Sequence, residues 1–181
     1  MPSSKQLTRR PTLAIVSHTL RRDLEEPLRH FARIQIVHLY HDASYRDMAR
    51  ADFASQPIRY RDSADLRRHL VALRPDIIQG PEPYASRIAV RNAWVVNRYA
   101  RATGTPYFFP MFENVPPRRK FGLILGGIME RLLGWYGRAA AGVIALNDGA
   151  ERNLLAASVD RRTITRLMWG TWGIDTTEFQ P

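Results

Sequence analysis

Short apolar runs alternate with helix-type periodic segments along most of this chain. The runs are continuous and rich in β-branched residues, as in TLAIVSH (12–18), IQIVHLYH (34–41) and GVIALN (142–147). Such runs are typical of parallel strands that helices cover on both sides. Because strand and helix alternate at least five times, the sequence predicts an α/β fold. We expect a doubly wound, mostly parallel sheet with helices on both faces, Rossmann-like in type.

The helices are predicted from apolar residues at helical spacing. We expect them over 19–34, over 63–74 with Ser63 as N-cap, over 84–102 before Gly104, over about 17 residues ending near Gly137, and over 148–158. A parallel sheet binds ligands beyond the carboxyl ends of its strands. Function is therefore sought in the loops that begin at His18, Gly80, Phe112 and Asn147.

The length of 181 residues predicts one domain. Residues 1–11 contain basic residues but no apolar signal region, and we expect a flexible tail there. The domain is expected over 12–172. The closing stretch GIDTTEFQP, 173–181, has the glycine and polar character of a connection, and we interpret it as the start of an interdomain linker.

Several functional classes are disfavoured by what the sequence lacks. The chain has no cysteine, which removes disulfides and thiolate metal sites. It has no G-x-G-x-x-G, P-loop or G-x-S-x-G motif, so dinucleotide oxidoreductases, P-loop enzymes and elbow-type hydrolases are not expected. His38 and His41 should face opposite sides of a strand, which argues against a shared metal ion. The apolar stretch FGLILGGIMERLLGWY, interrupted by Glu130 and Arg131, is too short to span a bilayer.

The net charge of +10 predicts attraction to anions. On the predicted helix after Tyr84, one face carries an indole surrounded by guanidinium groups: Arg87, Arg91, Trp94, Arg98 and Arg101. This face is either a phosphate-binding surface or a solvated face on which arginine stacks on tryptophan. Charge alone does not identify the partner.

Two strand ends deliver carboxylates to the same edge of the predicted sheet. Glu82 lies between two prolines after the strand at 76–80, just before Tyr84, and is either a helix-capping carboxylate or a substrate contact. Glu113 and Asn114 follow the aromatic strand PYFFPMF. An apolar setting of this kind raises a carboxyl pKa or orients a sugar hydroxyl, although a polar turn would have the same residues.

The segment RRKFGLILGGIMERLLGWYG combines a basic start with an apolar face. Arg118, Arg119 and Lys120 precede that face, which is formed by Phe121, Ile124, Leu125, Ile128, Leu132 and Trp135. The pattern fits an interfacial membrane helix, with Arg118, Arg119, Lys120 and Trp135 as membrane contacts. It also fits a helix that packs its apolar face on the sheet.

The last forty residues resemble the end of the N-terminal domain of a GT-B glycosyltransferase of the family 4 type. The resemblance rests on Val143 and Ile144 in a strand, followed after a helix and a strand by the motif GIDTTEFQP with Gly173, Asp175, Phe179 and Pro181. RPDIIQGPEPYAS and PYFFPMFENVP are similar to the preceding strands and loops of that family. Together these similarities cover about residues 12 to 181.

This resemblance implies transfer of a sugar from a nucleotide-sugar donor with retention at the anomeric carbon, without a metal or other cofactor. It implies that this domain holds the acceptor, and that a second domain after Pro181 carries most of the donor site; the chain alone would then be inactive. Glu113 and Asn114 become the candidate catalytic residues. The candidate substrate-binding residues are His18, Arg21, Arg22, Glu82 and Tyr84. His18, Arg21 or Arg22 would replace the glycine-rich first loop of the family.

The predicted acceptor is a saccharide of the cell envelope or a lipid-linked one. This predicts a cytoplasmic enzyme, peripheral on an anionic inner membrane face, with no nucleic-acid partner. The alternative is a non-catalytic Rossmann-like module that binds nucleic acid or another polyanion through the arginine-rich helix.

Overall fold

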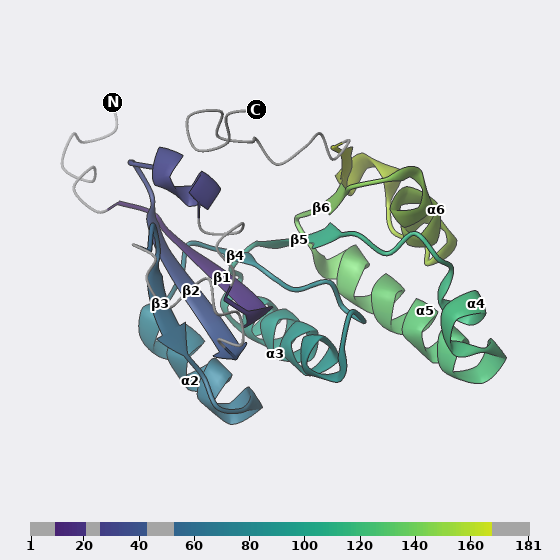
Figure 1. Ribbon diagram of the computed structural model, residues 1–181, viewed down its shortest axis with the longest axis horizontal. Helices are drawn as coiled ribbons and strands as arrows, with labels where there is room; N and C mark the ends of the chain where they lie inside the picture. Colours follow the sequence, from purple (N-terminus) through teal and green to yellow (C-terminus); the bar gives the residue numbers. More distant parts are fainter. Residues whose placement is uncertain (1–9, 21–25, 43–52, 168–181) are drawn as a thin grey trace, which may run out of the picture.

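The computed structural model describes residues 10–20, 26–42 and 53–167, which form a seven-stranded, wholly parallel sheet (Figure 1). The strand order is β3-β2-β1-β4-β5-β6-β7. The strands are β1 (Thr12–Thr19), β2 (Gln35–Asp42), β3 (Gln56–Arg59), β4 (Ile77–Gln79), β5 (Tyr107–Met111), β6 (Gly142–Ala145) and β7 (Ile164–Arg166). The predicted α/β, Rossmann-like fold is confirmed. Arg21, Arg22 and the expected linker at 173–181 lie outside the described residues.

The strand order reverses between β1 and β4. From β1 the chain moves through β2 to β3 on one side, and from β4 it moves through β5 and β6 to β7 on the other. Neighbouring strands pair in parallel, for example with Ile15 opposite His38 and Ala14 opposite Ile78. Since all strands point the same way, their carboxyl ends share one edge. Ligands of such sheets bind at that edge, near the point of reversal.

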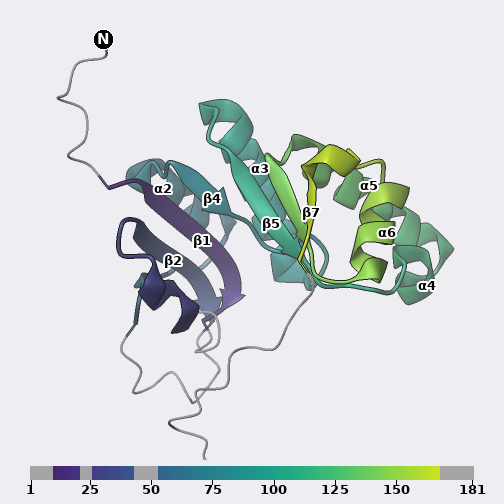
Figure 2. The ribbon, with the colours of Figure 1, turned by 90° about the horizontal axis from the view of Figure 1, so that it is seen from above.

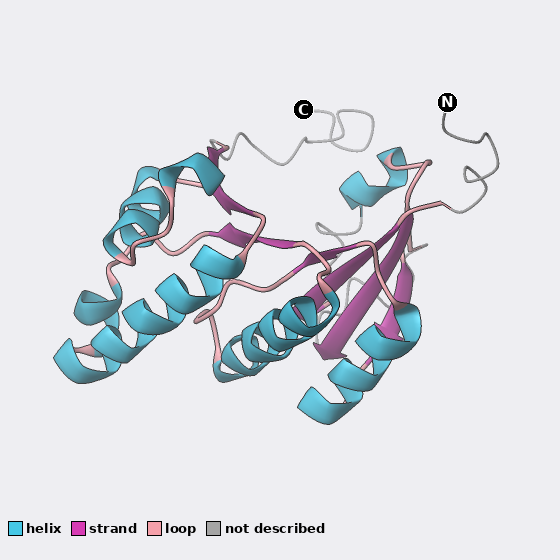
Figure 3. Cartoon of the chain, turned by 180° about the vertical axis from the view of Figure 1, so that it is seen from behind, coloured by secondary structure: helices cyan, strands magenta, loops and turns pink. Residues whose placement is uncertain are grey.

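The α-helices of the described residues are α2 (Ser63–Leu73), α3 (Arg87–Thr103), α4 (Pro117–Phe121), α5 (Leu123–Ala139) and α6 (Asp148–Ala156). Among them, α2 packs on α3, α3 on α5, and α5 on both α4 and α6. Figures 1 and 3 show α2, α3 and α5 side by side on one face of the sheet. The short 3₁₀ helix η1 (Glu26–His30) lies on the opposite side, and η3 (Arg161–Thr163) precedes β7.

The expected helix over 19–34 is not what the described residues show. They contain only the 3₁₀ helix η1, and Phe31, an apolar residue within the expected helix, is exposed after it. Pro27 gives the physical reason, because proline has no N–H to donate and its ring disfavours the preceding helical turn. A second, smaller difference is the cap of α2: the backbone N–H of Asp65 donates to the side chain of Asp62, so Asp62 is the N-cap in place of Ser63.

The helix of about 17 residues expected to end near Gly137 is α5, which has 17 residues and ends at Ala139; the short helix α4 before it, separated by Gly122, was not expected. No residue of the predicted apolar face is fully buried: Ile124, Leu125 and Ile128 in the first half of α5 are exposed, and the other three are half-buried. The buried large side chains of α5 are Leu133 and Tyr136, which lie on a different face of its second half. Core packing therefore accounts for only one end of this helix.

The core lies between the sheet and the row of helices. It is formed by aliphatic residues of β1, β2 and β4 and by a group of aromatic rings in which Tyr136 contacts Phe109 and Tyr107 at centroid distances of 4.6 and 4.9 Å. Buried polar groups are paired across elements: Asn92 of α3 donates to the Tyr60 hydroxyl at 2.6 Å, and that hydroxyl donates to the Ser17 carbonyl at 2.9 Å. This chain of hydrogen bonds ties α3 to the end of β1.

Candidate functional site at the carboxyl edge of the sheet

Glu82 extends from the loop after β4 toward the end of β5. Its Oε1 accepts a hydrogen bond from the backbone N–H of Glu113, with an N···O distance of 2.8 Å. Burial raises the pKa of the Glu82 carboxyl, and the negative charge of Glu113 adds to this, while backbone N–H groups of Glu113 and Phe112 oppose it. The Glu82 side chain thus connects two neighbouring strand ends, and its carboxyl is more easily protonated than that of an exposed glutamate.

Glu113 lies directly after β5 and has the opposite electrostatic setting. Partial burial acts to raise the pKa of its carboxyl, but the hydrogen bond from Lys120, the N–H of Val115 and the charge of Lys120 together hold it below its ordinary value. Its Oε1 accepts from the Val115 N–H at 3.0 Å, and its Oε2 pairs with the Lys120 ammonium. Glu113 is therefore ionised at neutral pH.

The loop that bears Glu113 is fixed from the other side by α6. The Asn147 side chain caps α6 by accepting from the Ala150 N–H, and its amide donates to the Phe112 carbonyl at 2.7 Å. The Asn153 amide donates to the carbonyls of Glu113 and Val115 at 2.9 and 3.1 Å. Three loop carbonyls are thereby held by two side chains of one helix.

Gly149 brings α6 into direct contact with the same loop. A Cβ atom at this position would lie 2.5 Å from the carbonyl oxygen of Asn114 and 2.7 Å from its Cα. Only glycine allows the first turn of α6 to approach the Asn114 backbone this closely. Asn114 itself is exposed, so its amide faces solvent at the edge of the site.

Tyr84 is placed differently from a surface binding residue. It is only 3% exposed, and its ring contacts Phe121 of α4 edge to face with a centroid distance of 6.1 Å. Its hydroxyl has no hydrogen-bond partner among the described residues. Burial, followed by the charges of Glu82 and Glu113, raises the pKa of Tyr84 far above its usual range. Tyr84 thus lies behind the carboxylates and remains neutral.

His18 belongs to a second group, at the ends of β1 and β2. Its ring lies 6.2 Å from that of His41, and His41 lies 5.5 Å from Tyr60. The Ser17 hydroxyl donates to the Thr19 carbonyl, so its single proton is used, and Nε2 of the buried His38 must donate to it at 2.7 Å. No contact between His18 and Glu82 is recorded within the described residues.

The structure thus joins some predicted site residues and separates others. Glu82, Tyr84, Glu113 and Asn114 gather at the ends of β4 and β5, whereas His18 lies over β1. Among the described residues, no three His, Cys, Asp or Glu side chains are grouped as metal ligands would be.

Asn153 was not expected at the site, and Lys120 was expected as a membrane contact alone. Asn147 was detectable, because asparagine before a helical segment is a strong N-cap signal. The contacts of Lys120 and Asn153 could not be detected from the sequence, because their common partner Glu113 is 7 and 40 residues away from them along the chain.

The fold is similar to that of two larger solved structures. One is described as a putative UDP-N-acetylglucosamine 2-epimerase from Listeria monocytogenes, with a TM-score of 0.55 and 13% identity over 87% of this chain and 45% of that one. The other, a UDP-N-acetylglucosamine 2-epimerase from Rickettsia bellii, has a TM-score of 0.54 and 12% identity over 87% and 44%. No protein-family model and no curated protein matches the chain. This chain spans less than half of either structure, and at such identity the likeness shows the fold alone.

Proposed function

We propose that this chain is the acceptor-side domain of an enzyme that transfers a sugar from a nucleotide-sugar donor with retention at the anomeric carbon. The observation that carries the proposal is the pair of carboxylates Glu82 and Glu113, held at adjacent strand ends with their pKa values shifted in opposite directions. Paired carboxyl groups with separated pKa values provide a proton donor and an acceptor in one site.

The two carboxyl groups retain capacity for a ligand. A carboxylate has about four lone-pair positions, and the hydrogen bonds described above use one on each oxygen of Glu113 and one on Oε1 of Glu82. The remaining lone-pair positions of the Glu113 carboxylate accept hydrogen bonds from hydroxyl groups of the saccharide acceptor. The exposed amide of Asn114 donates a hydrogen bond to a sugar oxygen. In this proposal Glu113 and Asn114 contact the reacting hydroxyl, and Glu82 fixes Glu113 through its backbone.

The reaction needs a donor site that these residues do not supply. The anomeric carbon loses its bond to the nucleotide diphosphate and gains one to the acceptor oxygen, while the proton of the acceptor hydroxyl passes to Glu113 and from there to the departing diphosphate. His18, over the end of β1, is placed near the point of strand reversal, where it would meet a donor phosphate; Arg21 and Arg22 follow it in sequence. The acceptor proposed is an envelope or lipid-linked saccharide, handled on the cytoplasmic side of the membrane.

A second candidate function is isomerisation of the nucleotide-sugar itself. It is favoured by the similarity to two structures described as UDP-N-acetylglucosamine 2-epimerases. The same carboxyl pair would then move a proton on the sugar ring instead of engaging an acceptor hydroxyl. The two candidates differ in their products, because transfer releases the nucleotide and isomerisation keeps it attached.

The test uses the full-length gene product with a panel of nucleotide-sugars, with and without saccharide acceptors. Chromatography should show acceptor-dependent release of nucleotide, and proton NMR should show the anomeric configuration of the donor in the product. Glu113→Gln should lower kcat by at least about 100-fold, as expected for loss of a positioned acid–base group. Epimerised sugar with the nucleotide still attached would support the second candidate and contradict transfer.

A further inference from the structure

Four exposed aliphatic side chains lie within six residues at the start of α5, just after α4. Leu123 is 78% exposed and Ile124 85%, more than any other large hydrophobic side chain described, and Leu125 and Ile128 follow at 48% and 53%. Figures 1 and 2 both place α4 at one extremity of the molecule. We call these four residues, with the cations Arg118, Arg119, Lys120 and Arg131, the α4–α5 tip.

The tip is a built feature, because α4 packs directly on the backbone of α5. A Cβ atom at Gly126 would lie 2.3 Å from the Cα of Arg118 and 2.6 Å from its nitrogen. This close approach holds the basic turn of α4 beside the first turn of α5. Arg118 is further fixed by an ion pair with Glu130 at 2.7 Å. The cationic and aliphatic side chains are thus presented together on a rigid helical corner.

The charges of the tip are only partly compensated. Arg118 pairs with Glu130 and Lys120 with Glu113, but within the described part of the chain neither Arg119 nor Arg131 has an acidic partner. A cavity of about 560 Å³ adjoins the tip between α5 and the end of α6; among its lining residues are Ile124, Ile128, Arg131, Arg138 and Ser158. This hollow therefore combines an aliphatic wall with guanidinium groups.

We propose that the α4–α5 tip docks on the surface of an anionic lipid bilayer. Aliphatic side chains insert at the level of the acyl boundary while arginines bind headgroup phosphates, the combination by which amphipathic helices lie in an interface. No described helix is long and apolar enough to cross a membrane, so the contact is peripheral.

Charge complementarity decides for an anionic surface against a second copy of this chain. Two copies meeting through the tip would bring Arg119 and Arg131 against the same cations of the partner, whereas lipid phosphates neutralise them. Trp135 takes no part in this contact: it is half-buried in the second half of α5 and stacks on Tyr136.

The proposal is independent of sugar transfer, but the two surfaces are connected. Lys120 belongs to the tip and pairs with Glu113 of the candidate site. Docking would therefore hold the carboxyl edge of β5 close to the membrane surface, where a lipid-linked acceptor is found.

The test is flotation of the chain with vesicles of phosphatidylcholine alone or with anionic phosphatidylglycerol. The double variant Leu123→Ser, Ile124→Ser should lower binding to anionic vesicles by at least about tenfold, because each inserted aliphatic side chain contributes roughly a factor of ten or more. The double variant Arg119→Gln, Arg131→Gln should lower it by about fivefold or more, and added salt should remove this difference.

Matched controls are available on other helices. Val71→Ser with Leu155→Ser removes exposed aliphatic side chains from α2 and α6, and Arg87→Gln with Arg91→Gln removes exposed cations from α3. Both pairs should leave vesicle binding unchanged. All these side chains are exposed, so circular dichroism should show native folding in every variant.

Three results would overturn the proposal. The first is that both tip variants bind anionic vesicles as strongly as the parent chain does. Another is equal binding to neutral and anionic vesicles. The third is no vesicle binding at all, including the case in which sedimentation shows a dimer that Leu123→Ser, Ile124→Ser disperses, which would make the tip a self-association surface.

Discussion

Glu82 and Glu113 have the same side chain at neighbouring strand ends, yet their surroundings shift the two carboxyl pKa values in opposite directions. Burial dominates at Glu82, whereas a lysine and a backbone N–H outweigh burial at Glu113. The sequence placed both carboxylates at one edge of the sheet, because parallel strands end together. It did not assign their different charge states, since these depend on Lys120 and on which carboxylate turns inward.

The first prediction concerns Glu82→Gln. The folded pKa of Glu82 is raised above its ordinary value of 4.5, so its contribution to stability is complete below about pH 4.5 and is lost as pH rises through the folded pKa. Glutamine keeps the acceptor for the Glu113 N–H without ionising. Thermal unfolding from pH 4 to 8 should therefore show that the stability of the variant increases relative to that of the parent as pH rises. A constant difference across this range would contradict the raised pKa.

The second prediction, for Glu113→Gln, has the opposite sign. The folded pKa of Glu113 is lowered, so its charged form contributes stability above pH 4.5 that is lost as pH falls through the folded pKa. The variant should be less stable than the parent at neutral pH, and the gap should close in acid. The same unfolding series measures it; a gap that widens in acid would show that Lys120 does not stabilise the carboxylate.

The third prediction separates Lys120 from its neighbour. Lys120 lowers the pKa of both Glu113 and Glu82, so Lys120→Gln should raise both. Carboxyl carbon-13 NMR titration measures these values directly. Arg119→Gln is the matched control, because Arg119 is an adjacent exposed cation with no acidic partner among the described residues, and it should leave both values unchanged. Equal effects of the two substitutions on the pKa values would show that Lys120 acts only through the general surface charge and not through its pairing with Glu113.

At the scale of elements, the strands were predictable and one helix was not. β1, β2 and β6 are continuous apolar runs whose boundaries agree with the structure within about two residues. The segment at 19–34 has helical spacing, but Pro27 lies inside it, and periodicity does not register a missing donor. The short helix α4 was not predicted, because Arg118, Arg119 and Lys120 had the pattern of a basic segment leading into the next helix. Gly122, with φ of 79°, separates α4 from α5, and Gly126 lets α4 pack on α5.

The fourth prediction tests how α6 holds the Glu113 loop. Gly149→Ala places a methyl group against the Asn114 backbone and should destabilise the fold by about 1–3 kcal/mol, as overpacking does, and should displace the loop. The matched control is Gly127→Ala in α5, where the added Cβ has no neighbour within 4 Å; it should stabilise by up to about 1 kcal/mol through helix propensity. Urea unfolding measures both free-energy changes. An unchanged free energy of unfolding for Gly149→Ala would show that the Glu113 loop moves aside without cost.

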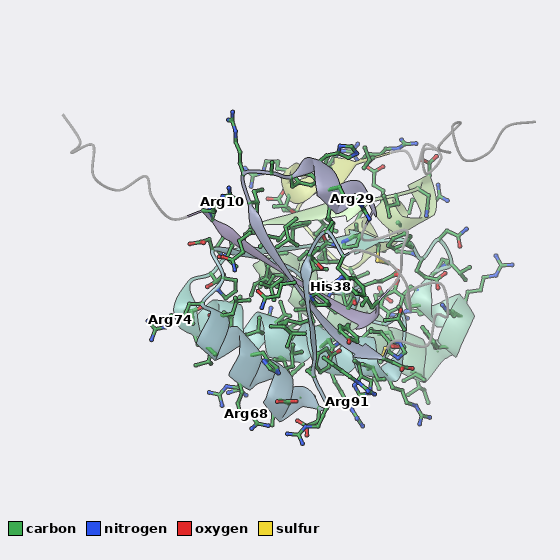
Figure 4. All side chains as sticks on the ribbon, turned by 60° about the vertical axis from the view of Figure 1, so that its left-hand side comes forward. Arg10, Arg29, His38, Arg68, Arg74 and Arg91 are labelled. Atoms are coloured by element: carbon green, nitrogen blue, oxygen red, sulfur yellow. The ribbon has the colours of Figure 1, made fainter. Side chains whose placement is uncertain are left out.

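At the scale of the whole molecule, positive charge is spread over many elements. In Figure 4, Arg68 of α2 and Arg91 of α3 lie at the lower edge, and Arg74, the C-cap of α2, lies at the left. Arg98 stacks on the half-exposed Trp94 at 4.8 Å. The alternative function, a polyanion-binding module, would use this face.

The fifth prediction addresses that alternative. Single-stranded RNA should bind the chain only weakly, with little difference between the parent and Arg87→Gln, Arg91→Gln. Fluorescence anisotropy at several salt concentrations measures this. A steep dependence of log affinity on log salt concentration, with a slope that the double variant reduces by about two, would favour polyanion binding instead. Each phosphate contact contributes nearly one unit to this slope.

The central claim is that the carboxyl edge at β4 and β5 holds a saccharide. The most direct measurement is a ¹H–¹⁵N NMR titration of this chain with envelope-type oligosaccharides, repeated with Glu113→Gln. We expect saturable chemical-shift changes centred on residues 80–84 and 112–115, and an affinity that is lower by about tenfold or more in the variant, as expected for loss of a charged hydrogen bond. Shifts centred on α3, or saccharide binding that Glu113→Gln leaves unchanged, would contradict it.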